Sequence, residues 1–376
     1  MANDTLTLAK NAKQNEFYTT YEVIEKEMNE YYEFNHDVFK DKTILLPCDD
    51  PEWSNFTKYF SANFKRLGLK KLISTSYAYN SKGLKTMWQP SLFEMDAPQY
   101  DENKSKSRGK IFILTRRNKN IDPDELKWRY LEGDGDFRSV EVTKLRNEAD
   151  IIITNPPFSL YREFFNWIME GKKKFAIIGN QTVYTYKEIF PYIKSNQVWV
   201  GTYSGEMAFR VPIDYEPKPT RYWQDETGQK WRSMGNATWL TNLDHGKRHE
   251  PLGLMTMSDN LKYNKKFINK TKKEFGELKY PEYDNFDAIE VCLVSAIPLD
   301  YDGYLGVPVT FLDKYCPAQF EIVGSFNASS IQEKEKNDYV LSKDTVIIDK
   351  GIKKMWNGPV VNKKPLFKRI VIKRKL

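Results

Sequence analysis

The sequence predicts an α/β protein with a doubly wound, mostly parallel sheet, followed by a second, C-terminal domain of mixed α/β structure. Short apolar runs alternate with stretches of helical spacing over the first two hundred residues, and this alternation is typical of a parallel sheet covered on both faces. The length of 376 residues favours two domains, because single cores seldom serve more than about 250–300 residues. After about residue 205, glycine, proline, tryptophan and tyrosine become frequent and short alternating segments replace the helical ones.

Each expected element depends on a local pattern. Apolar runs predict the strands of the first domain, at 43–47, 69–76, 110–115, 139–142, 150–154 and 174–179. Helical spacing predicts helices within 16–33, 55–67 and 161–171. The polar stretch 97–109 has no apolar periodicity, and we expect a surface loop there. We place the domain boundary at residue 245, which gives domains of residues 1–244 and 245–376.

Charge is distributed unevenly along the chain. The net charge is +7 and the isoelectric point lies near 8.9, which on their own indicate a polyanionic partner only weakly. Residues 262–273 interleave lysines with Tyr263 and Phe267, and residues 362–376 carry seven lysines and arginines around an apolar Ile-Val-Ile. Either run alone is typical of a solvated face or a frayed tail. Together they favour a protein that neutralises phosphates.

Cysteine and histidine are scarce. The three cysteines are far apart and form no Cys-x-x-Cys pair, which argues against a disulfide framework or a zinc site and fits a reducing cytosol. Three histidines offer little material for a metal centre, so we expect none. No apolar stretch approaches the ~20 residues that cross a bilayer, and residues 1–4 lack the basic and apolar regions of a secretory signal. We therefore expect a cytoplasmic protein.

The motif that carries chemistry is Asn155-Pro156-Pro157-Phe158, directly after the apolar run 150–154. Ligands of open α/β sheets bind beyond the carboxyl ends of the strands. Because prolines restrict φ and lack an N–H, the loop is stiff and presents acceptors. The Asn155 side-chain oxygen and the Pro156 carbonyl can accept both hydrogens of an exocyclic amine, which turns the nitrogen lone pair toward an electrophile. Phe158 can stack on a planar base, a contact worth ~1–3 kcal/mol. A Pro-Pro turn that merely ends a strand is the structural alternative.

The amine of a nucleobase is too weak a nucleophile for most carbon centres. It can take a methyl group from a sulfonium by in-line displacement, where positioning supplies most of the acceleration. The known chemistry of the motif therefore implies S-adenosyl-L-methionine as the cofactor.

Further motifs stand in order along the chain: 15–19, 48–51 followed by 54–56, 135–137, 155–158, 235–243 and 300–308. On these segments the chain resembles the EcoRI-type adenine-specific DNA methyltransferases over nearly its whole length, in the gamma arrangement of amino-methyltransferases. The resemblance implies a Rossmann-like methyltransferase sheet, with residues 1–244 as catalytic domain and residues 245–376 as DNA target-recognition domain. It implies catalytic roles for Asn155, Pro156 and Phe158, and a target-base pocket formed by Phe158 and Trp239. The residues that it implies for cofactor binding are Phe17, Tyr18, Thr19, Asp49, Asp50, Asp136, Phe137 and Asn155.

The loop at 48–52 departs from the usual pattern, because it lacks the glycines of a typical first methyltransferase motif. Asp49 or Asp50 should hold the amino-acid end or the ribose of the cofactor, and the sequence leaves open which of the two does so. An ordinary acidic loop with a helix cap is the alternative for both. A surface turn is the alternative for Asp136 and Phe137, and core packing is the alternative for Phe17, Tyr18 and Trp239.

The expected function is transfer of a methyl group to adenine N6 in double-stranded DNA, in a restriction-modification or mobile-element context. A target base must leave the duplex to reach such a pocket. Any restriction endonuclease would be a separate chain, and one polypeptide of this kind can act as a monomer. Related acceptors are the alternatives within the class: RNA adenine, cytosine N4 or a protein glutamine. A catalytically inactive DNA-binding regulator is the alternative outside it.

Overall fold

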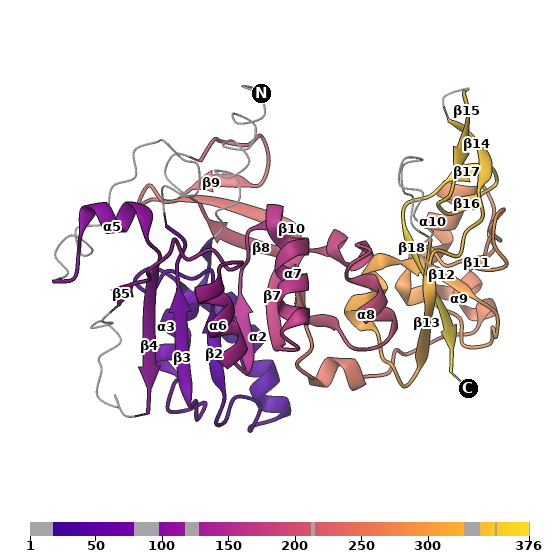
Figure 1. The fold of residues 1–376 in the computed structure, drawn as a ribbon. Helices are drawn as coiled ribbons and strands as arrows, with labels where there is room; N and C mark the ends of the chain where they lie inside the picture. Colours follow the sequence, from indigo (N-terminus) through magenta and orange to yellow (C-terminus); the bar gives the residue numbers. More distant parts are fainter. Residues whose placement is uncertain are drawn as a thin grey trace. The chain divides into compact units, whose positions relative to one another are not determined.

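The protein is described by a computed structural model that covers residues 18–78, 98–116, 128–211, 215–326, 339–349 and 352–375 (Figure 1). The chain forms two compact units. The first comprises 1–180 and 200–245, and the second comprises 181–199 and 246–376. Residues 181–199, which we expected in the first domain, thus belong to the same compact unit as the C-terminal region.

The first unit contains a ten-stranded mixed sheet whose strand order runs β1-β8-β10-β7-β6-β2-β3-β4-β5, with β9 paired to β10. Its centre is parallel. The four central strands are β7 (Lys174–Asn180), β6 (Ile151–Thr154), β2 (Thr43–Leu46) and β3 (Lys71–Thr75). The residues of β2 and β6 are all buried, as expected for strands covered on both faces.

Antiparallel strands flank this centre. On one side lie β4 (Lys110–Thr115) and β5 (Arg129–Tyr130). On the other lie β10 (Lys230–Thr241), β9 (Tyr222–Gln224), β8 (Trp199–Arg210) and β1 (Tyr18–Thr19). The expectation of a mostly parallel sheet therefore holds for the four central strands alone. Apolar runs in a sequence mark strands, but they carry no information about the direction of a strand relative to its neighbour.

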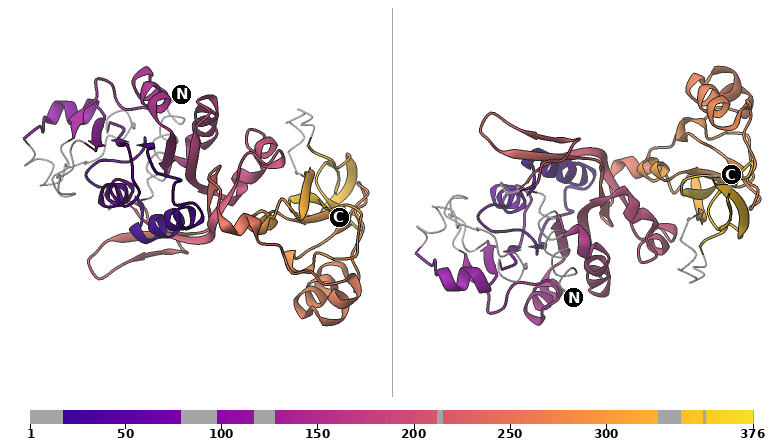
Figure 2. Two further views of the ribbon diagram at one scale, coloured as in Figure 1. Left: turned by 90° about the horizontal axis from the view of Figure 1, so that it is seen from below. Right: turned by 90° about the horizontal axis from the view of Figure 1, so that it is seen from above.

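Helices cover both faces of the sheet (Figure 2, indigo helices on one side and magenta helices on the other). The helices α2 (Tyr21–Phe34) and α3 (Asn55–Ala62) share one apolar cluster with alternate residues of the central strands, among them Ile44 and Ile153. The helix α7 (Tyr161–Glu170) packs on the opposite face, where the rings of Phe165 and Phe175 meet edge to face at 5.9 Å. The helix α6 (Val140–Glu148) is joined to α7 by the bond from Arg146 to the Trp167 carbonyl.

Two local expectations for this unit were wrong. The stretch 97–109, expected as a loop, contains the helix α5 (Glu102–Ser107), whose first turn is capped by the Asp101 side chain. Capping stabilises this short helix, which buries only Ser105. Because it has no buried apolar face, the sequence shows no apolar periodicity there. The segment 139–142, expected as a strand, begins α6 instead, because the Ser139 hydroxyl caps the helix at the Val142 N–H.

The second unit is built on a four-stranded sheet of order β11-β12-β18-β13. These strands span Ile289–Glu290, Leu305–Pro308, Arg369–Arg374 and Phe320–Phe326, respectively. Two hairpins accompany it: β14 (Thr345–Asp349) with β15 (Ile352–Trp356), and β16 (Val360–Val361) with β17 (Lys364–Pro365). Its helices are α8 (Phe190–Lys194), α9 (Met257–Tyr263) and α10 (Lys265–Phe275). The short 3-10 helices of the two units are η3 (Phe158–Leu160), η4 (Gln181–Thr185), η5 (Gly246–His249), η6 (Val294–Ala296) and η7 (Val309–Lys314).

The basic C-terminal run is not a frayed tail. The strand β18 pairs with both β12 and β13, and its residues Arg369, Ile370, Val371 and Ile372 are buried. The Arg369 guanidinium lies against the Glu290 carboxylate, with Nη2 at 2.8 Å from Oε1, and Glu290 is fully buried. Tyr283 also donates to this carboxylate. The apolar residues 370–372 place the strand β18 inside the sheet and the buried Arg369 is paired, whereas the lysines at 363, 364, 373 and 375 are exposed.

Among the described residues, no helix combines the length and the apolar character that crossing a membrane requires.

Candidate active site

Between β2 and β6, the order in which successive strands are added to the sheet changes from one side to the other. From β2 the chain moves outward to β3, and from β6 it moves outward on the other side to β7, so that β2 and β6 are parallel neighbours. Ligands of open α/β sheets bind at the carboxyl ends of the strands that flank such a point. Asp49 and Asp50 follow β2, and Asn155 follows β6. The topology therefore brings the two most informative motifs of the sequence to one edge of the sheet.

The loop of residues 155–158, called the acceptor loop below, follows Thr154 at the end of β6, and Thr154 is fully buried. Asn155 is half-buried, Pro156 is buried, and Phe158 is half-buried at the start of η3. Backbone freedom is small on both sides of Asn155, because Thr154 is held in the sheet and Pro156 has a restricted φ. The loop thus has the stiffness that the Asn-Pro-Pro sequence predicts.

Asp49 lies beneath this loop and is only 6% exposed. One carboxyl oxygen accepts from the Ser54 hydroxyl at 2.6 Å, and the other accepts from the Thr154 hydroxyl at 2.6 Å. Its backbone N–H donates to the Thr75 carbonyl, and its carbonyl accepts from the Ser74 hydroxyl at 2.5 Å. Burial raises the pKa of Asp49 to about 7, against the hydrogen bonds, which lower it. The buried Asp49 therefore connects the carboxyl ends of the parallel strands β2, β3 and β6.

Asp50 is placed differently, because its side chain is 27% exposed. It accepts from the Glu52 N–H at 2.9 Å and lies 3.5 Å from the Lys110 ammonium. Glu52 accepts from Lys110 at 2.6 Å and from the Trp128 indole N–H at 2.8 Å. Burial raises the pKa of Glu52, although Lys110 opposes this shift. Sequence reasoning missed Glu52, Lys110 and Trp128, which lie too far apart along the chain for a motif to announce them.

The N-terminal motif reaches the same edge through β1. This strand pairs with β8, and the Thr19 carbonyl accepts from the Asn55 side chain at 2.8 Å. Asn55 begins α3, directly after the Ser54 cap that bonds to Asp49. Thr19 is buried and Tyr18 is 45% exposed. Phe17, the remaining residue of this prediction, lies outside the described residues.

Gly135 brings the next motif close to the carboxyl end of β3. Its φ of +81° and its distance to the Ser76 carbonyl, where an added Cβ would lie 2.1 Å from the oxygen, together require a glycine. Asp136 follows and accepts from the Arg138 side chain at 2.7 and 2.9 Å. Burial alone would raise the pKa of Asp136, but the Arg138 hydrogen bonds hold it below its ordinary value. Asp136 is thus an ionised acid at this edge.

Phe137 and Trp239 are packed in the protein interior. Phe137 is 5% exposed and meets the rings of Phe164 and Trp167 at 5.0 and 5.6 Å, whereas Trp239 is fully buried in β10 and meets Phe56 edge to face at 6.0 Å. These contacts agree with the core-packing alternative for Trp239. Contact of either side chain with a ligand stays a prediction. No local sequence signal separates a core aromatic from a pocket aromatic.

An α/β fold with an Asn-Pro-Pro-Phe loop at the switch point of its sheet is consistent with the class of amino-directed methyltransferases. Residues 5–375 match the family described as adenine-specific methyltransferase EcoRI. The chain belongs to this family and is an adenine-specific DNA methyltransferase.

Its relatives include three type II methyltransferases. It is 41% identical to M.EcoRI of Escherichia coli over 324 residues, which cover 85% of this chain and 89% of the relative. It is 34% identical to M.MpnI of Mycoplasma pneumoniae, over 84% of this chain and 83% of the relative. It is also 34% identical to M.MgeORF184P of Mycoplasma genitalium, over 84% of each chain. No solved structure matches the chain.

Proposed function

We propose that this enzyme transfers the methyl group of S-adenosyl-L-methionine to N6 of an adenine that is flipped out of double-stranded DNA. The observation that carries the proposal is the location of Asn155-Pro156-Pro157-Phe158 at the carboxyl end of β6, beside the acidic loop that follows β2. A Rossmann-like, doubly wound arrangement of the first unit belongs to the same proposal, since helices lie on both faces of the sheet.

The acceptor loop supplies the chemistry of the target amine. The Asn155 side-chain oxygen and the Pro156 carbonyl accept the two amino hydrogens, so the nitrogen lone pair leaves conjugation with the ring and faces the methyl donor. Phe158 supplies a flat ring for the base, a contact of about 1–3 kcal/mol. These contacts offset the few kcal/mol that base flipping requires.

We assign the cofactor contacts to Tyr18, Thr19, Asp50, Asp136 and Phe137. S-adenosyl-L-methionine supplies an electrophilic methyl group on a sulfonium. The donor set fits this cofactor, because Asp50 is a partly exposed carboxylate suited to its ammonium or ribose hydroxyls, and Asp136 is an ionised acid. Of the two acids left open by the sequence, we assign the direct contact to Asp50. It is the more exposed of the pair.

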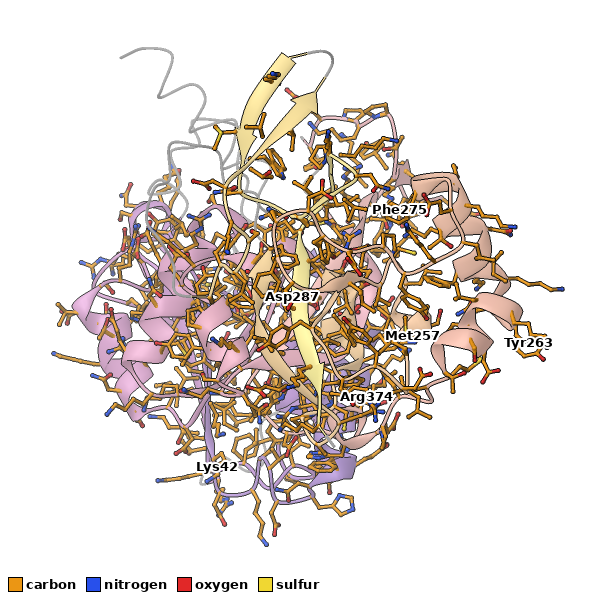
Figure 3. The ribbon with its side chains drawn as sticks, turned by 90° about the vertical axis from the view of Figure 1, so that its right-hand side faces the viewer. Lys42, Met257, Tyr263, Phe275, Asp287 and Arg374 are labelled. Atoms are coloured by element: carbon orange, nitrogen blue, oxygen red, sulfur yellow. The ribbon has the colours of Figure 1, made fainter. Side chains whose placement is uncertain are left out.

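DNA binding is proposed for residues 245–376, with the phosphate contacts on α10. The exposed lysines of this helix and of the end of α9 are Lys262, Lys265, Lys266, Lys272 and Lys273. Phe267 and Thr271 turn inward and orient the basic face toward solvent. Tyr263, which is 60% exposed, points outward beside this face (Figure 3). Side chains of this unit would read bases in the major groove, while phosphate contacts set the register.

The biological setting is part of the proposal. A type II relative in Escherichia coli suggests a restriction-modification context with a separate endonuclease, and a mobile element is the alternative setting. We propose that the enzyme acts as a monomer in the cytoplasm.

The test is expression in a host without DNA methylation, followed by sequencing that detects modified bases. The expected result is N6-methyladenine at one recognition sequence. Transfer of tritium from labelled cofactor to DNA, RNA and protein substrates separates the alternative acceptors. Cofactor and DNA binding without any turnover would support the inactive regulator instead.

A further inference from the structure

The carboxyl group of Asp49 joins structural parts that are far apart in the sequence. Ser54, the cap of α3, donates to one oxygen, and Thr154, the last residue of β6, donates to the other. The Asp49 backbone is itself bonded to Ser74 and Thr75 at the end of β3. One side chain thus connects the ends of β2, β3 and β6 with the start of α3.

This arrangement leaves Asp49 little capacity for a ligand. Both of its oxygens are engaged at 2.6 Å, and the residue is 6% exposed. The charged neighbour that raises its pKa is Asp50, which repels the ionised form of Asp49 and lies beside Lys110. Asp50 therefore has the exposure that a cofactor ligand needs, while Asp49 has the bonds of a structural connection.

The connection acts on the residue that performs the chemistry. Thr154 immediately precedes Asn155, so its hydroxyl bond to Asp49 holds the chain just before the acceptor side chain. Pro156 restricts the chain immediately after it. An active-site group must be held within about 0.5 Å of its productive position, and the bond to Asp49 holds the only flank of Asn155 that is not restricted by proline.

We propose that Asp49 is a positioning residue: through Thr154 and Ser54 it holds the strand end that presents Asn155, and it does not bind the methyl donor. The proposal rests on the proposed function and replaces the expectation of a direct Asp49 contact with the cofactor.

The test compares Asp49→Ala, Asp49→Asn and Thr154→Val in the full chain. Because small misplacements near the reacting atoms can reduce rates by up to about a hundredfold, Asp49→Ala and Thr154→Val should lower kcat at saturating cofactor by about tenfold or more. Their Kd for S-adenosyl-L-methionine should stay within about threefold of the wild type. Asp49→Asn keeps the shape and one acceptor and should recover part of the rate. The matched control is Thr241→Val, which removes a buried hydroxyl bonded to the Phe175 carbonyl near the start of β7 and should leave kcat unchanged.

Three outcomes overturn the proposal: a loss of cofactor affinity beyond tenfold in Asp49→Asn with kcat restored at saturation, an unchanged kcat in Thr154→Val, or an equal loss in the control. Hydrogen exchange of the peptide 151–160 provides a readout that does not depend on activity, and it should rise in Asp49→Ala and Thr154→Val. If the wild type transferred no methyl group to DNA, the proposed function would fail. Cofactor affinity and hydrogen exchange would still decide the role of Asp49.

Discussion

The buried ion pair between Arg369 and Glu290 gives a stability prediction whose size follows from the structure. Glu290 is fully buried and Arg369 is 8% exposed, and three nitrogen-to-oxygen contacts of 2.8–3.1 Å join them. Arg369→Leu would leave the buried Glu290 carboxylate bonded to the Tyr283 hydroxyl but without its cationic partner. Breaking such a pair from either side costs about 3–5 kcal/mol.

Replacing both members should cost far less. A buried pair exchanged for apolar residues is often neutral or more stable by about 1–4 kcal/mol, and the Tyr283 hydroxyl left unsatisfied costs about 1–3 kcal/mol. The free energy of unfolding of the double variant Arg369→Leu with Glu290→Leu should therefore lie within about 3 kcal/mol of the wild-type value. The losses of the two single variants sum to about 6–10 kcal/mol.

The assay is urea unfolding of the wild type, both single variants and the double variant, with the unfolding of the second unit followed by hydrogen exchange of the amides in 369–374. Arg374→Leu, at the half-exposed end of the same strand, is the control and should change stability little. Single variants that each lose less than 1 kcal/mol, or a double variant that loses the full sum, would refute the reasoning.

Four further predictions concern activity, pH and DNA binding. Asn155→Ala should abolish methyl transfer while DNA affinity, measured by titration, stays nearly unchanged. Phe158→Ala should lower kcat more than cofactor affinity, because the proposed role of its ring is to stack on the base and not to bind the donor. Since burial raises the pKa of Asp49 to about 7, the folded state favours the protonated acid. The contribution of protonated Asp49 to the free energy of unfolding is complete below about pH 4 and is lost as the pH rises toward 7, by roughly 4 kcal/mol. The free energy of unfolding of Asp49→Asn, measured across this range, should lack that loss. Removing the charges of Lys265 and Lys266 should reduce the dependence of log Kd for DNA on log salt by about two.

Controls keep these predictions specific. For the lysine pair, the same change at the exposed Lys58 and Lys65 of the first unit should leave the salt dependence unaltered. Full activity of Asn155→Ala on a cognate duplex would contradict the catalytic assignment, and an unchanged rate for Phe158→Ala would contradict stacking. A wild type whose pH dependence of stability matched that of Asp49→Asn would contradict the raised pKa of Asp49.

The sequence alone established the features that depend on near neighbours along the chain. Apolar runs predicted β2, β4, β6 and β7, because a strand buried on both faces must be continuously apolar. The Asn-Pro-Pro-Phe tetrapeptide lies directly after a strand, as predicted, and its chemistry stays a prediction. Ordered motifs indicated the family, which the match over residues 5–375 confirms.

Tertiary structure decided what depends on distant partners. Strand direction at the flanks of the sheet, the helices at 102–107 and 140–148, and the inclusion of β18 in a sheet follow from long-range pairing and capping that apolar periodicity does not encode. The same holds for Asp49 and Asp50, which are neighbours in the sequence with the same side chain. One is enclosed by Ser54 and Thr154, whereas the other is partly exposed beside Glu52 and Lys110, and these partners come together only in the folded chain.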